Sequence, residues 1–244
     1  FAAENIQVLH DTRVSEFKLS QGRKSAVLAG AGSGELEFDE VLLATGRTAN
    51  TEQLGLEALG IGTTDTGTLA VNDYLQTACP TVYACGDVAG PYQFTHMSAF
   101  QAWFASINSL FGSFKKFRID YRIVPHATFV DPEIARVGLN EQEAKAKDIP
   151  YEVVRYELDD LDRAIADGEN TGYVKVLTVP GKYRILGVTI VVYHASELMP
   201  QFTLAMTHGL GLKKIMGTFH VYPTLSESSK FVAGQWRKQH APQW

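Results

Sequence analysis

Strand-length apolar runs separated by turn residues are the feature that most constrains the second half of this chain. Five of them follow one another, and they cover residues 127–129, 134–137, 151–158, 172–179 and 183–193. The last two runs are joined by the short turn Pro180-Gly181-Lys182, which suits an antiparallel pair of strands. The pattern therefore predicts an antiparallel sheet in this part of the chain.

Helical patterns surround these runs. Asn140 with Glu143 three residues later forms a capping box, which predicts a helix through about residue 147. Further helices are expected at 196–208, at 212–216 and from Thr224 to about residue 237, where Thr224 and Glu227 form a second capping box. An antiparallel sheet with flanking helices is an α+β arrangement, so we predict an α+β domain over residues 122–244.

The first 48 residues form a small β-rich segment in this interpretation. Strands are expected at residues 6–9, 13–19, 24–28, 35–38 and 40–44, with a hairpin turn at residues 30–34. The run from Val41 to Ala44 is continuously apolar and ends in a glycine turn, which is typical of a buried parallel strand. Beyond it we predict a second such strand at 82–85 and a helix over 95–111.

Composition narrows the class of protein. With 45% hydrophobic and 20% charged residues over 244 positions, the chain is expected to fold into one large domain or two ordinary ones. A net charge of -5 argues against a nucleic-acid partner held by a basic surface. Two cysteines exclude a disulfide scaffold, and the histidines lack ligand spacing, so no metal site is expected. No apolar run approaches the roughly 20 residues of a membrane helix, so we expect no membrane contact and a cytoplasmic location.

Gly86 and Asp87 form a candidate ligand site at the end of the predicted strand 82–85. A glycine lets the backbone approach a ligand, and a carboxylate just past a buried strand can accept hydrogen bonds from ligand hydroxyls. The next helix begins near Phe94, so its free N–H groups can face an electron-rich ligand edge. The alternative is a turn aspartate that only satisfies loop backbone.

Five motifs place these residues in a wider pattern. They are ATGRTAN at 44–50, TACPTVYACGDVAG at 77–90, PHATFVDPEIARVGLNEQEA at 125–144, RILGVTIVVYHASEL at 184–198 and YPTLSE at 222–227. In this order the chain resembles the pyridine nucleotide-disulfide oxidoreductases, the family of dihydrolipoamide dehydrogenase, glutathione reductase and mercuric reductase. The first two motifs resemble the segments next to FAD, and the last three resemble the C-terminal dimerisation domain.

The resemblance implies a role for each part of the chain. Residues 1–48 would be the tail of the NAD(P)H-binding domain, 49–121 the returning part of the FAD-binding domain and 122–244 the interface domain of a homodimer. The first two are partial α/β segments in this interpretation. By the same resemblance Asp87 would bind the ribityl chain of FAD. The implied cofactor-binding residues are Gly46, Arg47, Gly86, Asp87, Phe94, Thr95 and His96.

Several family features do not occur in this sequence. The FAD-binding GxGxxG, the redox-active cysteine pair and the second glycine fingerprint lie upstream of the matched region in the family. Cys79 and Cys85 do not match the redox pair, so we expect free buried thiols. Because the chain also begins with Phe1, we predict the C-terminal half of an oxidoreductase that acts in redox homeostasis. Its upstream half would be its partner, and this half alone would be inactive and would not retain FAD.

Tyr222 departs from the family pattern. Disulfide reductases place a histidine before the proline and pair it with a glutamate, as acid and base in the partner subunit's site; here Tyr222 stands there and Glu227 is retained. A phenol, with a pKa near 10, donates a hydrogen bond at neutral pH but is a poor base. Mercuric reductases also place a tyrosine there, although their extra C-terminal cysteine pair has no match in HAPQW. Each residue also has an alternative role. Tyr222 could simply pack in an interface, and Glu227 could do no more than cap a helix. His220, two residues before Tyr222, is a candidate substitute base.

Two alternatives to this function remain open. One is a non-catalytic dimerisation module that binds no cofactor by itself. The other is a diverged flavoprotein whose acceptor is not a disulfide, similar to mercuric reductase. The presence or absence of a cysteine pair in the upstream sequence would distinguish a disulfide reductase from this last alternative.

Overall fold

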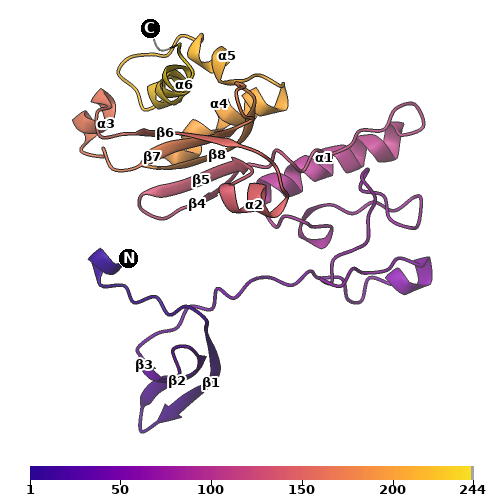
Figure 1. The fold of residues 1–244 in the computed structure, drawn as a ribbon. Helices are drawn as coiled ribbons and strands as arrows, with labels where there is room; N and C mark the ends of the chain where they lie inside the picture. The colour runs from indigo at the N-terminus through magenta and orange to yellow at the C-terminus, as the bar shows by residue number, and fades with distance from the viewer. Residues whose placement is uncertain (243–244) are drawn as a thin grey trace. The chain divides into compact units, whose positions relative to one another are not determined.

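The computed structural model describes residues 1–242 and divides the chain after Thr48. The first unit is Phe1–Thr48, and the second begins at Ala49. The first unit contains the short 3-10 helix η1 (Ala2–Glu4) and three strands, β1 (Thr12–Ser20), β2 (Arg23–Gly30) and β3 (Gly34–Phe38). The strands form an antiparallel sheet in the order β1-β2-β3 (Figure 1).

Two of the strands predicted for this unit are wrong. Residues 6–9 and 40–44 belong to no strand, and Leu42 and Leu43 are 89% and 68% exposed. A buried parallel strand is stabilised only by neighbours on both sides. Among the described residues all the strand pairs in the sheets are antiparallel, so this apolar run has no neighbour to pair with.

The second unit starts with irregular structure that holds the 3-10 helices η2 (Leu56–Leu59) and η3 (Gly86–Val88), followed by helix α1 (Thr95–Phe111). Helix α1 has the predicted bounds. The strand predicted at 82–85 is wrong, because only Tyr83 pairs there, in one isolated bridge with Gln76.

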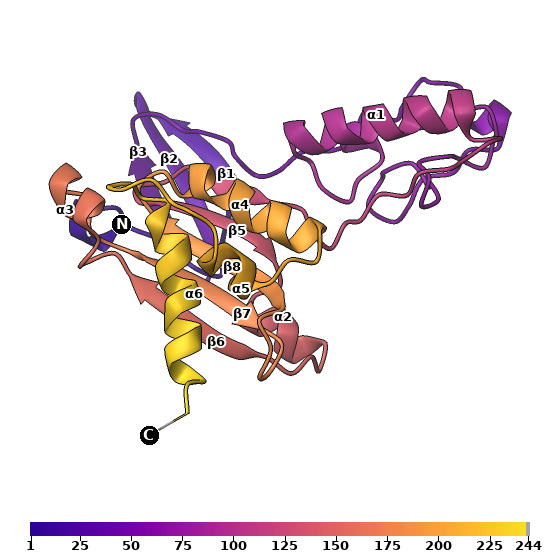
Figure 2. The ribbon, with the colours of Figure 1, turned by 90° about the horizontal axis from the view of Figure 1, so that it is seen from above.

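An antiparallel five-stranded sheet follows, as the sequence predicts. Its order is β4-β5-β8-β7-β6, and the strands are β4 (His126–Thr128), β5 (Glu133–Gly138), β6 (Glu152–Glu157), β7 (Tyr173–Thr178) and β8 (Ile185–Val192). Helices α4 (Ala195–Thr207) and α6 (Glu227–Gln239) pack on the sheet, with α5 (Leu212–Met216) against α6 (Figures 1 and 2).

The main core lies between this sheet and helices α4 and α6. Val188 and Ile190 on β8 are completely buried, as are Phe202 on α4 and Val232 on α6. The indole N–H of Trp236 donates to Thr178 Oγ1 at 3.1 Å, so the buried polar atoms between α6 and β7 satisfy one another. Apolar burial therefore holds the helices, and this hydrogen bond fixes the position of α6.

Helix α2 (Glu141–Ala146) begins with the predicted capping box. Asn140 Oδ1 accepts from the Glu143 backbone N–H at 2.8 Å, and Glu143 Oε2 accepts from the Asn140 N–H at 3.0 Å. The second predicted box is only half formed. Glu227 Oε2 accepts from the Thr224 N–H at 3.2 Å, but the Thr224 hydroxyl donates to Val221 O, so α6 begins at Glu227 instead of Thr224.

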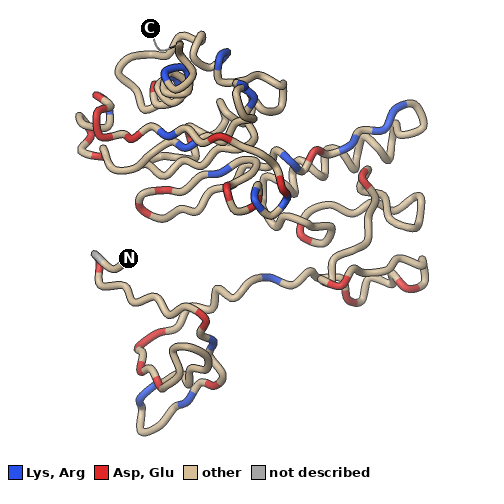
Figure 3. Tube along the Cα trace, viewed as in Figure 1, with Lys and Arg blue, Asp and Glu red and all other residues tan. Residues whose placement is uncertain are grey.

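Helix α3 (Asp162–Asp167) was not predicted from the sequence. It has six residues, and Leu161 at its N-cap offers no side-chain oxygen. Buried Leu161 and Ala164 anchor it to the core instead. Acidic residues gather along α3 and the loop before it (Figure 3): Asp159, Asp160, Asp162 and Asp167.

Glu143 makes the stability of α2 depend on pH. Burial raises the pKa of its carboxyl group, but hydrogen bonds from Arg136 and from the Asn140 N–H outweigh burial, so the net pKa lies below the usual value of 4.5. The ionised form is therefore favoured in the folded state. This contribution to stability is complete above the unfolded-state pKa and is lost as pH falls through the folded-state pKa.

We expect Glu143→Gln to lower the free energy of unfolding at neutral pH by about 1 kcal/mol or less, because the carboxylate is partly screened by solvent. The loss should shrink as pH falls below 4.5, which urea unfolding between pH 3 and 7 measures. Glu141→Gln on the same helix is the matched control, since the Glu141 carboxylate pairs with Lys175 and is not part of the capping box of Asn140 and Glu143. An equal loss at every pH would contradict this account of Glu143.

Candidate functional site

The corner between η3 and α1 brings together Gly86, Asp87 and the start of the helix. Gly86 has φ = +78°, and a Cβ there would lie 3.1 Å from Ser98 Oγ on α1. A side chain would therefore strain the backbone and push η3 away from the helix. Asp87 follows on η3 and is half-buried.

Gln101 on α1 holds the corner together. Its side chain is fully buried, and Oε1 accepts from the Gly86 N–H at 2.6 Å. Its Nε2 donates to Gly90 O at 2.8 Å and to Tyr121 Oη at 2.9 Å. Sequence reasoning missed this residue, although a glutamine four positions after Met97, on the apolar face of the helix, was a visible signal.

The N-terminus of α1 has no side-chain cap. Phe94 is the N-cap residue and cannot accept a hydrogen bond through its side chain, while Thr95 and His96 are exposed in the first turn. An uncapped first turn leaves backbone N–H groups and the positive end of the helix dipole available. In a helix of 17 residues, this end suits an anionic or electron-rich ligand edge.

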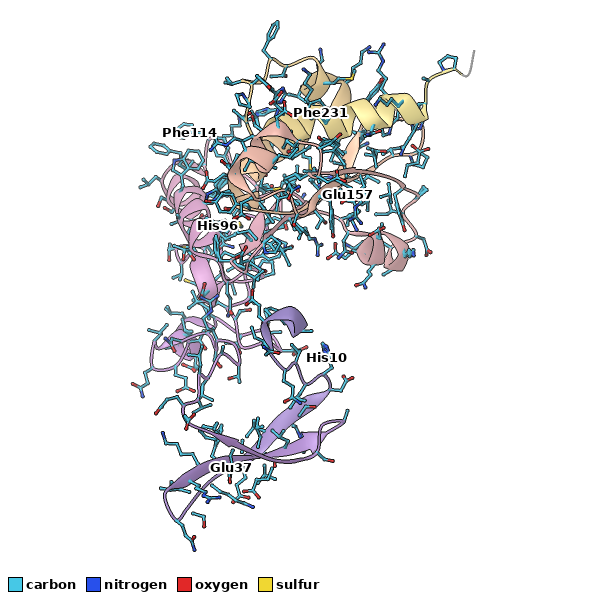
Figure 4. All side chains as sticks on the ribbon, turned by 90° about the vertical axis from the view of Figure 1, so that its left-hand side faces the viewer. His10, Glu37, His96, Phe114, Glu157 and Phe231 are labelled. Atoms are coloured by element: carbon cyan, nitrogen blue, oxygen red, sulfur yellow. The ribbon has the colours of Figure 1, made fainter. Side chains whose placement is uncertain are left out.

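Stacked rings fix the side chains at this end of α1. Phe94 stacks on Tyr92, His96 and His126, with ring centroids 5.9, 5.3 and 5.7 Å apart and interplanar angles of 14° or less. The His96 Nε2–H donates to Pro125 O at 2.9 Å (Figure 4 labels His96). Burial lowers the pKa of His126, so its ring is uncharged at neutral pH. The predicted residues Phe94 and His96 are therefore held in one rigid group.

Gly46 and Arg47 belong to the first unit, whereas Gly86 and Asp87 belong to the second. Gly46 has φ = +110°, in the region that favours glycine, and Arg47 is exposed. Their role at the site stays a prediction.

Tyr222 and Glu227 take different partners. Tyr222 is 67% exposed, and its hydroxyl donates to Asp162 Oδ2 at 2.8 Å. This hydrogen bond, with the charge of Asp162, raises the pKa of the Tyr222 phenol above its usual value. Glu227 is 7% exposed and accepts from the Thr224 N–H. Among the described residues no hydrogen bond joins Tyr222 to Glu227, and sequence reasoning missed Asp162.

His220, the alternative base, is occupied on both ring nitrogens. Nδ1 lies 2.9 Å from Thr218 O, and Nε2 lies 2.8 Å from Gln201 Nε2. A carbonyl only accepts, so we assign the proton to Nδ1 and let Nε2 accept from the Gln201 amide. The lone pair that a base needs is therefore already engaged.

Cys79 and Cys85 are free thiols, and both are half-buried instead of fully buried. Within residues 1–242, no group of three or more His, Cys, Asp or Glu side chains is arranged to hold a metal ion. None of the helices in that range is long and apolar enough to cross a membrane.

We expect Gln101→Met to lower the free energy of unfolding by about 2 to 4 kcal/mol, because it leaves the buried Gly86 N–H and Gly90 O unpaired. Urea unfolding measures the loss, and hydrogen exchange at the Gly86 amide should speed up with it. Ser109→Ala is the control, since Ser109 is exposed on the same helix and its hydroxyl donates to Ser106 O within one turn. A variant as stable as the wild type would remove Gln101 from this role.

Two family models match the chain in sequence order. Residues 1–103 match the pyridine nucleotide-disulphide oxidoreductase model, and residues 124–232 match the dimerisation domain of the same proteins. Mercuric reductase of Staphylococcus aureus is 36% identical over 225 residues, which is 91% of this chain and 41% of the relative. Dihydrolipoyl dehydrogenase of Chlamydia muridarum is 35% identical over 191 residues, which is 78% of this chain and 40% of the relative.

Solved structures agree in fold. LpdA from Mycobacterium tuberculosis superposes with a TM-score of 0.89 at 24% identity, and the match covers 97% of this chain and 50% of that one. The HOCl-induced flavoprotein disulfide reductase RclA from Escherichia coli superposes with a TM-score of 0.80 at 25% identity, covering 91% and 50%. The chain thus spans about half the length of these relatives or less.

Proposed function

Since the chain belongs to the pyridine nucleotide-disulphide oxidoreductase family, we propose that it is the C-terminal part of an FAD- and NAD(P)H-dependent oxidoreductase. Residues 1–48 belong to the NAD(P)H-binding domain, 49–121 to the FAD-binding domain and 122–244 to the interface domain. The observation that carries this proposal is the corner of η3 and α1, where Gly86, Asp87 and an uncapped helix start converge.

The residues of this corner fit a flavin dinucleotide. The Asp87 carboxylate can accept hydrogen bonds from ribityl hydroxyls, and the absence of a side chain at Gly86 keeps η3 close to the helix. The first-turn N–H groups at Thr95 and His96 can bond an electron-rich ring edge, with Phe94 holding His96 in place. By the family resemblance, Gly46 and Arg47 are further proposed cofactor-binding residues. When bound, FAD supplies two-electron chemistry between NAD(P)H and the acceptor.

The interface domain pairs with a second copy and presents Tyr222 to the partner subunit's active site, with Glu227 behind it in support. The Tyr222 phenol, with its pKa raised by Asp162, remains protonated at neutral pH and donates a hydrogen bond there. Glu227, buried at the start of α6, holds the backbone of Thr224 and so fixes the segment that carries Tyr222. The acceptor is a disulfide or, in the diverged alternative, a metal–thiolate complex. We propose a cytoplasmic location for the enzyme.

We expect the 244-residue chain by itself to be a colourless, inactive dimer, because the missing glycine fingerprints leave most of the cofactor unbound. Light scattering at micromolar concentration measures the association, and visible absorbance after incubation with FAD measures flavin binding. A monomer would contradict the interface role, and a yellow chain that keeps FAD through gel filtration would contradict the need for the upstream half.

In the full-length enzyme, Asp87→Asn should weaken FAD binding by about 10- to 100-fold, since an amide with one neutral acceptor replaces a charged acceptor whose hydrogen bonds are worth about 1.5 to 3 kcal/mol. Equilibrium release of FAD, followed by flavin fluorescence, checks this. Asp65→Asn is the matched control, because Asp65 is exposed in a loop of the same segment. If the two variants bound FAD equally well, Asp87 would have no part in the site.

A further inference from the structure

Asp162 and Tyr222 form a pair that joins two distant segments of the interface domain. They lie 60 residues apart in sequence, and Tyr222 Oη donates to Asp162 Oδ2 at 2.8 Å. Asp162 is the first residue of α3, and Tyr222 lies in the segment 218–223 before α6.

The two sides of the pair are held very differently. Helix α3 is anchored by Leu161 and Ala164, which are 2% and 0% exposed. The segment around Tyr222 is exposed instead, with Phe219 at 102% and Val221 at 75%. Little packing therefore restrains the Tyr222 ring, and its hydroxyl is held by Asp162.

The charged groups near the pair do not compete with the Tyr222 phenol for the Asp162 carboxylate. The adjacent cation, Arg163, pairs with Asp167 at 2.7 Å. Glu227 adds a further negative charge, which contributes least to raising the pKa of the Tyr222 phenol. Both carboxylates favour the protonated phenol, so the hydroxyl keeps its proton while Asp162 accepts its hydrogen bond.

We propose that Asp162 is a positioning residue that holds the Tyr222 hydroxyl at a fixed place on the exposed segment 218–223. The inference rests on the proposed function, in which Tyr222 completes the partner subunit's site. Because the ring is already placed, the hydroxyl needs only to rotate about its Cζ–Oη bond to donate to an acceptor there. Holding a donor close to its working geometry is worth large factors in rate.

Tyr156 on β6 and Asp160 in the loop before α3 provide an internal comparison. Tyr156 donates to Asp160 Oδ1 at 2.7 Å, but Tyr156 is 7% exposed and its ring lies 5.3 Å from that of Phe231. Burial first, and then Asp160, raises the pKa of Tyr156. Packing holds the Tyr156 ring even without Asp160. Asp160→Asn therefore removes a similar carboxylate and leaves the Asp162–Tyr222 hydrogen bond in place.

The test uses the 244-residue chain labelled with 13Cζ-tyrosine, with the Tyr222 signal assigned by Tyr222→Phe. We expect Asp162→Asn to lower the midpoint of the Tyr222 titration, because the variant loses the charge that favours the protonated phenol. Asp162→Glu, which keeps the charge, should restore the midpoint in part. Asp160→Asn should move the Tyr156 signal and leave Tyr222 unchanged.

Two results would overturn the inference in this experiment. One is an unchanged Tyr222 midpoint in Asp162→Asn. The other is an equal shift of Tyr222 in Asp160→Asn, which would show a general effect of negative charge instead of a specific pair. Both variants alter exposed or partly exposed carboxylates, and circular dichroism confirms that each chain is folded.

A second measurement in the full-length enzyme separates this inference from the proposed function. Asp162→Asn should lower turnover with the acceptor by about tenfold, with reduction of the flavin by NAD(P)H and the KM for NAD(P)H unchanged. Asp160→Asn should be unaffected. Normal turnover in Tyr222→Phe would refute the role of Tyr222 in the proposed function, whereas loss in Tyr222→Phe with normal turnover in Asp162→Asn would refute only the role of Asp162.

Discussion

The burial of one face of the five-stranded sheet beneath α4 and α6 supports everything else in the interface domain. This contact buries Phe202 on α4 and Val232 on α6 against side chains of β7 and β8. The hydrogen bond from Trp236 to Thr178 adds a polar link between α6 and β7. Because α6 is fixed in this way, the segment before it has a defined end at Glu227. That segment can then carry exposed side chains, such as Tyr222, without losing its place.

The sequence predicted those elements whose stability comes from their own pattern. The apolar spacing of residues 95–111 and the capping box at Asn140 act within a few residues, so α1 and α2 begin where expected. The strand predicted at 40–44 was wrong, because a buried parallel strand needs neighbouring strands, and the residues of the run do not specify them. Helix α3 was missed because burial of Leu161 and Ala164 stabilises it, and its sequence has no N-cap residue that would indicate where it begins.

The same distinction separates the site residues that were found from those that were not. Gly86 and Asp87 lie in a short motif and Phe94 lies at the start of a strongly periodic helix, and the structure places them in one corner. Side chains join Gln101 to Gly86 and Gly90, and Asp162 to Tyr222, and spacing along the chain does not identify these partners. For Gln101 itself, the spacing did offer a clue, because it puts a polar residue on the apolar face of the predicted helix.

The two edges of the five-stranded sheet affect how copies of this domain can associate. One edge is β4, with only three residues, and the other is β6, where charged Arg155 and Glu157 are exposed. Short or charged edges disfavour the addition of a further strand. Subunits of this domain are thereby steered away from continuous sheets and open-ended fibres, toward closed assemblies made through helices and loops.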